Sequence, residues 1–253
     1  MKKTIATLLF TLSTLAASGT VVAAGGSQVE LQKPDIDLKD GDSMIRGAKT
    51  FMAYCATCHS AEFMRYSRIG QDFGLGEEAL LDMLVPPGGA IGDTISAGMP
   101  DDYAERIFGK APPDLSVITR ARGADWIYTY LLSFYEDDAH TLGSNNAVYK
   151  NAGMPNVFVN EQGIQRAVYE MVEQDDGEGE KPRFVGLELA EPGEMSQDAF
   201  EAKIRDLVNF MVYMGEPSAI KRQELGPWVL AFILLFTFVA FLLKKEYWRD
   251  VKK

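Results

Sequence analysis

Hydrophobic residues are unevenly distributed along this 253-residue chain, and the longest apolar run lies near its C-terminus. Residues 225–243 read LGPWVLAFILLFTFVAFLL and contain no charged residue. About 20 apolar residues in a helix cross a bilayer core, so this run predicts a single transmembrane helix. Trp228 lies near one end of it, and Tyr247 and Trp248 follow the other, where aromatic rings favour the membrane interface.

Two segments before this run show apolar residues at helical spacing. In the first, the apolar positions are Met44, Ile45, Ala48, Phe51 and Met52. Asp42 or Ser43 is the expected N-cap of that helix. In the second, about Gln197 to Met214, one stripe is formed by Phe200, Ile204, Leu207, Val208 and Met211. We expect the two helices to cross, with Gly47 permitting a close approach.

A different pattern occupies the region before the second helix. Residues 165–172 and 183–190 are rich in Val, Tyr, Phe and Leu and flank an acidic loop at 173–181, which predicts a β-hairpin. Residues 86–89 and Asn145–Asn146 are expected to be loops. The predicted fold class is therefore mainly α, with a small β-hairpin insertion and one C-terminal transmembrane helix.

The N-terminus has the pattern of a secretory signal. Lys2 and Lys3 precede an apolar stretch, and Val22-Ala23-Ala24 offers small residues for cleavage. The sequence thus predicts a signal peptide at 1–24, an exported domain at 25–224, a transmembrane helix at 225–243 and a tail at 244–253.

Charge supports this topology. Removing the +2 of the first 24 residues and the +3 of residues 225–253 from the net charge of −11 leaves −16 for the exported domain. Such a domain repels nucleic acid and attracts cationic partners. Five Lys or Arg residues follow the span and two closely precede it, so the positive-inside rule places the C-terminus in the cytoplasm. A single-pass protein of the inner membrane with a periplasmic domain is expected.

The chain has two cysteines, and both lie in one motif, CATCH at Cys55–His59. A CxxCH motif is the attachment signature of c-type haem. Each thiol can add to one haem vinyl group, and the adjacent His59 can bind the iron. One motif predicts one covalently bound haem c, held through Cys55 and Cys58.

Two other readings of the cysteines are weaker. A thioredoxin-like CxxC follows a strand, whereas the residues before Cys55 predict a helix. A structural zinc site needs four ligands, and His140, the other histidine, lies far away beside an acidic stretch.

A second axial ligand would complete an electron-transfer centre, and a Met would raise its potential. Two of the eleven Met residues, Met99 and Met154, lie in Ala-Gly-Met-Pro stretches whose Pro favours an extended backbone at the Met. Spacing from His59 favours Met99, but the residues alone leave both open.

Several further motifs resemble one known family. They are APPDLS at 111–116, RARG at 120–123, the helix WIYTYLL at 126–132, Gly153-Met154-Pro155, LVNF at 207–210, Gly215-Glu216-Pro217 and the span ending KKEYW at 244–248. Together they resemble cytochrome c1, the haem c subunit of ubiquinol–cytochrome c reductase. The resemblance covers essentially the whole mature chain.

The resemblance implies a cytochrome c-like haem domain and roles for individual residues. His59 would be the proximal ligand and Met154 the second axial ligand. An Arg of the RAR stretch would pair with a haem propionate, with Arg120 the first candidate and Arg122 the second.

The resemblance also implies partners. They are cytochrome b and a Rieske iron–sulfur protein in a dimeric membrane complex, with a cytochrome c as electron acceptor, so the chain would be a redox subunit and no enzyme by itself. An autonomous tethered cytochrome c that serves a terminal oxidase is the alternative. A haem peroxidase or gas sensor with an open axial site is a third reading, which Met154 and the family motifs disfavour.

Overall fold

The computed structural model describes residues 29–173 and 179–251. The expected signal peptide, 1–24, lies outside the described residues, as does most of the acidic loop. The helices are α2 (Gly41–Thr50), η1 (Phe51–Cys55), α3 (Tyr66–Phe73), α4 (Glu77–Met83), α5 (Asp101–Phe108), α6 (Ile118–Arg122), α7 (Ala124–Leu132), α8 (Val159–Gln162), α9 (Gln197–Gly215) and α10 (Ala219–Tyr247). The strands are β1 (Ala61–Arg65), β2 (Thr94–Ile95), β3 (Phe134–Glu136), β4 (Ser144–Asn146), β5 (Gly163–Glu173) and β6 (Glu180–Pro192).

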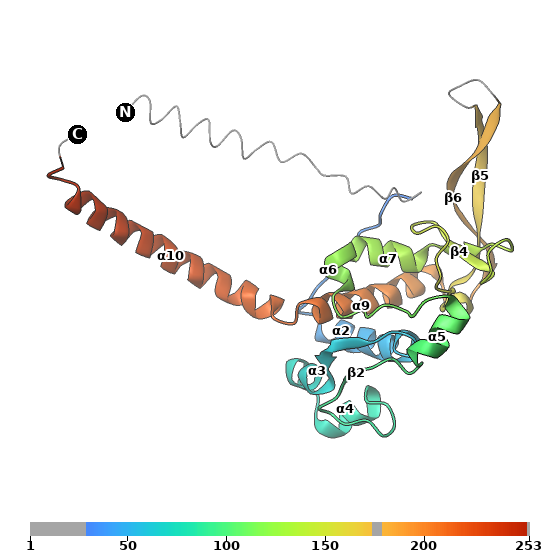
Figure 1. Ribbon diagram of the computed structural model, residues 1–253, viewed down its shortest axis with the longest axis horizontal. Coiled ribbons are helices and arrows are strands. Elements are labelled where there is room, and N and C mark those ends of the chain that lie inside the picture. The colour runs from blue at the N-terminus through green and yellow to red at the C-terminus, as the bar shows by residue number, and fades with distance from the viewer. Residues whose placement is uncertain (1–28, 174–178, 252–253) are drawn as a thin grey trace.

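The predicted fold class is confirmed. Helices dominate the domain, and the strands form three separate two-stranded antiparallel sheets, β1–β2, β3–β4 and β5–β6. Figure 1 shows α2 and α9 side by side at the centre, with α6 and α7 on one side and α3 and α4 on the other.

Helices α2 and α9 cross at very close range, as predicted. A Cβ placed on Gly47 would lie 2.0 Å from the carbonyl oxygen of Asp206 and 2.8 Å from the Cβ of Phe210. Only a glycine fits at that point. The expected stripe of α9 is buried in the same core, where Ile204, Leu207 and Val208 are fully covered.

The start of α2 corrects the expected N-cap. Asp40 is the cap, and its carboxylate accepts a hydrogen bond from the backbone N–H of Ser43 at 2.9 Å. The predicted caps, Asp42 and Ser43, were wrong because the helix begins two to three residues earlier. The hydroxyl of Ser43 instead donates to Asp206 at 2.6 Å and so joins α2 to α9.

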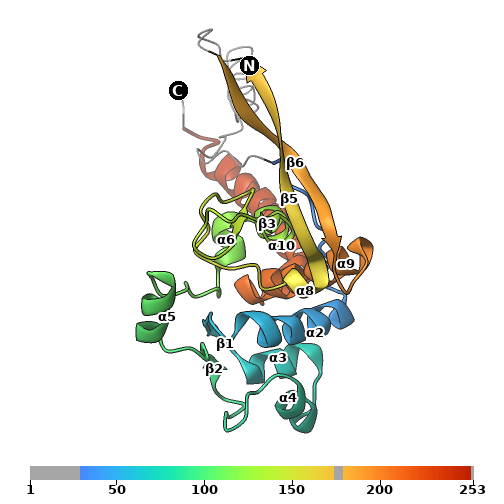
Figure 2. The same ribbon diagram turned by 90° about the vertical axis from the view of Figure 1, so that its right-hand side faces the viewer.

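The predicted hairpin is confirmed and is longer than expected. Strands β5 and β6 pair from Gly163–Pro192 to Glu173–Glu180, beyond the predicted 165–172 and 183–190. Figures 1 and 2 show the hairpin projecting away from the helical domain. Its base turns at Gly163, which has a φ of +86° and leaves no room for a Cβ beside Glu191.

Residues 86–89 form the predicted loop, but Asn145–Asn146 do not. They belong to β4, and both side chains are buried. The side-chain oxygen of Asn146 accepts from the backbone of Val148 at 2.9 Å and of Tyr149 at 3.0 Å. Turn-forming residues are buried here because their amides satisfy the backbone of the segment that follows.

Helix α10 contains the whole predicted span. Its 29 residues are long and apolar enough to cross a membrane, which makes it a candidate membrane span. Figure 1 shows it extending away from the domain. Large apolar side chains along it are exposed, including Phe232 at 66% and Leu234 at 71%. Such a surface on a single helix suits lipid rather than water.

We expect Gly47→Ala to destabilise the protein by at least about 2 kcal/mol, because the added methyl group meets backbone atoms that cannot move independently. The measurement is thermal or urea unfolding of the full chain in detergent. Gly41→Ala is the matched control on the same helix, since nothing lies within 4 Å of its added Cβ. Equal stability of the two variants would contradict the close crossing.

Candidate functional site: an apolar cavity behind the CxxCH motif

A large cavity opens between the helices and holds ≈1320 Å³ of empty space, including its mouth. Its lining comes from residues 54–59, 108–118, 122–131 and 149–157, together with Met211 of α9. Most of the side chains are aliphatic or aromatic. A cavity lined mainly by apolar side chains, with few polar groups, suits a mainly apolar ligand.

The backbone before the motif places both thiols at this cavity. Segment η1 widens the helical turn, so that the N–H of Ala56 reaches the carbonyl of Phe51 at 3.0 Å. Such wide turns are frequent at functional sites. Cys55 and Cys58 both line the cavity as free thiols, and burial, with a smaller contribution from Cys58, raises the pKa of Cys55 to about 12.

The surroundings of the cysteines do not resemble a thioredoxin site. Helix α2 and η1 precede Cys55, and strand β1 follows the motif rather than preceding it. The helix predicted before the motif is therefore confirmed.

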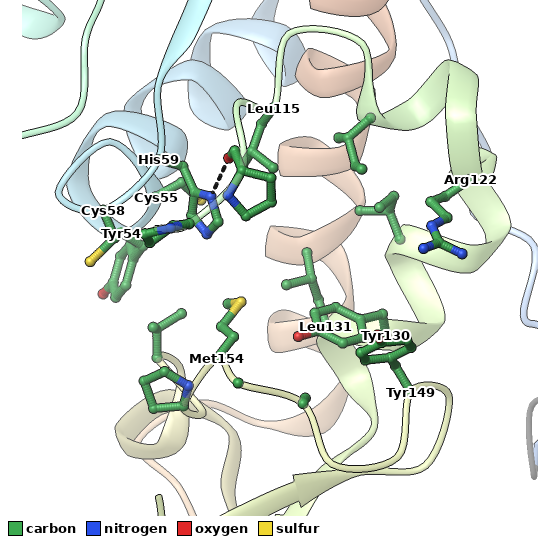
Figure 3. Close-up of a pocket in the computed structure, with 18 of the residues that line it drawn as sticks. Tyr54, Cys55, Cys58, His59, Leu115, Arg122, Tyr130, Leu131, Tyr149 and Met154 are labelled. Atoms are coloured by element: carbon green, nitrogen blue, oxygen red, sulfur yellow. Dashed lines mark hydrogen bonds between the residues drawn. The ribbon is translucent and has the colours of Figure 1, made fainter. Parts of the chain in front are cut away.

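His59 is oriented by its neighbour in the PPDLS stretch. Its Nδ1 lies 2.7 Å from the carbonyl oxygen of Pro113, drawn as the dashed line in Figure 3. Because a carbonyl can only accept, Nδ1 carries the hydrogen and Nε2 keeps a free lone pair. Burial lowers the pKa of His59, although the hydrogen bond to Pro113 and the charge of Asp114 oppose it. The neutral ring is the form that binds a metal.

Asp114 clamps the same stretch to the CxxCH segment. One carboxylate oxygen accepts from the hydroxyl of Ser60 and the backbone of Glu62, each at 2.8 Å, and the other accepts from the backbone of Ser116 at 2.8 Å. Burial opposes the charge, but these hydrogen bonds hold the pKa of Asp114 below its usual value. No role was predicted for Pro113 or Asp114; the available signal was the pair of prolines, Pro112 and Pro113, directly before an acidic residue.

Of the two candidate methionines, Met154 lines the cavity and Met99 does not. Figure 3 shows the sulfur of Met154 turned into the space across from the ring of His59. Met99 instead donates its backbone N–H to the carbonyl of Thr57 at 2.8 Å. The choice of Met154 remains a prediction, and this placement supports it.

The two arginines of the RAR stretch differ in their position relative to the cavity. Arg122 lines the cavity, and its guanidinium carbon lies 5.2 Å from the ring centre of Trp126. That ring stacks on Tyr130 at 5.0 Å. Both arginines are exposed, but Arg120 does not line the cavity. The geometry thus favours Arg122, the second candidate in the sequence analysis, over Arg120.

His140 lies outside the cavity. Its Nδ1 accepts a hydrogen bond from the backbone of Leu142 at 3.4 Å, and the ring is half-buried. It contacts the turn between β3 and β4 and is not brought to the CxxCH motif.

The chain is similar to known cytochrome c1 proteins. The model of the cytochrome C1 family matches residues 87–251. The chain is 44% identical to cytochrome c1 of Allochromatium vinosum over 237 residues, which cover 94% of this chain and 96% of the relative. It is 42% identical over 242 residues to a Nitrosomonas europaea protein named ammonia monooxygenase gamma subunit, covering 96% of this chain and 97% of that protein. Cytochrome c1 of Rhodospirillum rubrum is 27% identical over 279 residues, covering 94% and 97%. The chain belongs to the cytochrome c1 family.

Proposed function

We propose that this chain is the haem c subunit of a quinol–cytochrome c reductase, accepting single electrons from a Rieske iron–sulfur protein and passing them to a cytochrome c. The observation that carries the proposal is the cavity, where two free thiols, a neutral imidazole and a thioether meet within an apolar lining. Membership of the cytochrome c1 family supports an electron-transfer haem subunit of a bc1 complex.

The residues at the cavity fit one haem c. Cys55 and Cys58 would bind it covalently, His59 would be the proximal ligand and Met154 the second axial ligand. When bound, the haem supplies reversible one-electron chemistry at its iron. A thioether ligand and a buried, apolar environment favour the reduced state and so raise the potential. If His59 and Met154 both bound the iron, no substrate would need to bind at the metal.

A few polar residues at the cavity orient the side chains that would hold the haem. The carbonyl of Pro113 fixes the tautomer of His59, and Asp114 holds Pro113 in place. Arg122 is the proposed partner of a haem propionate. Its guanidinium lies over the ring of Trp126, which keeps this exposed side chain beside the cavity.

We expect Arg122→Leu to lower the reduction potential, because a nearby positive charge favours gain of an electron. Arg120→Leu is the matched control, two positions away and outside the cavity, and should leave the potential nearly unchanged. A redox titration of the purified full chain measures both. A larger drop for Arg120→Leu would restore Arg120 as the propionate partner.

We expect Met154→Leu to abolish the thioether–iron charge-transfer band, lower the potential and let carbon monoxide bind the ferrous protein. Met99→Leu should change none of these, since Met99 does not line the cavity. Optical spectra of the two variants decide the ligand. An unaltered spectrum for Met154→Leu would show that Met154 is not an iron ligand. Tight binding of carbon monoxide by the wild-type protein would favour a peroxidase or gas sensor.

The proposed location follows from the two ends of the chain. The acidic domain would lie in the periplasm and face cationic electron-transfer partners. Helix α10 would cross the inner membrane beside cytochrome b, with the basic C-terminal residues in the cytoplasm. The complex would be dimeric, as the family resemblance implies.

Mild-detergent purification through a tag on this chain tests the assembly. We expect b-type haem, an iron–sulfur protein and quinol-dependent reduction of cytochrome c to co-purify. Recovery of the chain alone, with haem c and no quinol-dependent activity under the gentlest extraction, would instead support an autonomous tethered cytochrome. If the chain co-purified with subunits of an ammonia monooxygenase, it would belong to that assembly and not to a quinol–cytochrome c reductase.

A further inference from the structure

A charged cluster lies behind the wall of the cavity, on the side of Met154. The amino group of Lys203, on α9, donates to a carboxylate oxygen of Glu161, on α8, at 2.8 Å. The hydroxyl of Tyr54 donates to the same oxygen. The amino group also lies 4.3 Å from the ring centre of Tyr54. Since Tyr54 itself lines the cavity (Figure 3), the cluster reaches the cofactor space through a single side chain.

The ion pair of this cluster is largely withdrawn from water. The side chain of Glu161 is 12% exposed and that of Lys203 is 21% exposed, whereas most ion pairs of the described residues have at least one side chain more than half exposed. Burial alone would raise the pKa of Glu161, but hydrogen bonds from Lys203 and Tyr54 bring it below its usual value. A buried ion pair adds little to the free energy of unfolding, because the cost of desolvating both charges offsets their attraction. Such a pair instead favours one arrangement of the chain over others.

That arrangement concerns the segment that carries Met154. Phe158, four residues later, is 1% exposed and packs on Tyr54 with ring centres 4.7 Å apart. On its other side the segment is tied to α7, because Asn156 donates to Gln162 at 2.9 Å and Gln162 donates to the carbonyl of Leu132 at 2.8 Å. Residues 154–158 form no helix or strand, so these side-chain contacts determine where the thioether lies.

We propose that Tyr54, Glu161 and Lys203 are positioning residues that hold the Met154 segment against the haem-attachment segment and thereby keep the thioether within reach of the iron. Tyr54 directly precedes Cys55, Glu161 follows Met154 by seven residues, and Lys203 joins both to the central helix. The inference rests on the proposed function, in which Met154 is the second axial ligand.

The test uses the full chain with its haem, in detergent, and imidazole as an external ligand that binds ferric iron only when the thioether has left it. Lys203→Met keeps the aliphatic stem and removes the charge that holds Glu161. We expect imidazole to bind the variant roughly tenfold more tightly, because its apparent affinity follows the population of the state without the thioether. The thioether–iron charge-transfer band should weaken in parallel.

Asp206→Asn is the matched control, because it removes an ion pair from the same helix one turn later. Asp206 pairs with Arg46 at 2.6 Å and accepts from Ser43, so the contacts described for it are with α2 and not with the Met154 segment. The control should bind imidazole as the wild type does. Equal tightening in both variants would show general loosening of α9 and overturn the proposal, as would an unchanged affinity in Lys203→Met.

Tyr54→Phe provides a second variant, which keeps the ring and the ion pair and removes one hydrogen bond. It should tighten imidazole binding by roughly threefold, which corresponds to the lower end of the net contribution of one hydrogen bond. Should Lys203→Met not accumulate, this variant decides the matter, and wild-type affinity in it would overturn the proposal. A wild type without the thioether–iron band would instead refute the axial role of Met154, which is a failure of the proposed function.

Discussion

The contact of α2 with α9 at Gly47 is the constraint on which the rest of the structure depends. The backbone carbonyl of Asp206, on α9, occupies the space that a side chain at position 47 of α2 would fill. This crossing fixes the segment that leads into the CxxCH motif relative to the helix that supplies Met211 to the cavity floor. Helix α9 ends at Gly215, and three residues separate it from the start of α10, so α9 connects the cofactor space to the candidate membrane span.

Apolar and polar residues have different roles at the cavity. Apolar side chains supply most of its surface, which gives an environment of low polarity where a charge on the iron is costly. A few polar groups act on single atoms: Pro113 on the ring of His59, Asp114 on the PPDLS backbone, and the Lys203–Glu161 pair on Tyr54. These contacts orient the side chains that line the cofactor space.

Features that depend on the spacing of residues along the chain could be predicted from the sequence. The choice between candidate residues a few positions apart could not. The CxxCH motif, the stripe of α9 and the hairpin each follow from spacing along the chain. The N-cap of α2 was missed because several cap-forming residues lie within four positions, and Ser43 is used for a contact with α9. Arg120 and Arg122 lie two positions apart on a five-residue helix and point to different sides, so only the packing of α6 shows which one reaches the cavity.

Covalent attachment of haem through Cys55 and Cys58 can be tested by intact mass spectrometry of the full chain, unfolded in denaturant and extracted with acidified organic solvent. We expect the mass of the polypeptide plus one haem, and neither Cys55 nor Cys58 should react with thiol reagents. Replacement of either cysteine by Ala should leave at most a single thioether bond. A mass without haem, or two thiols that react freely or form a disulfide in protein isolated from its native membrane, would contradict it.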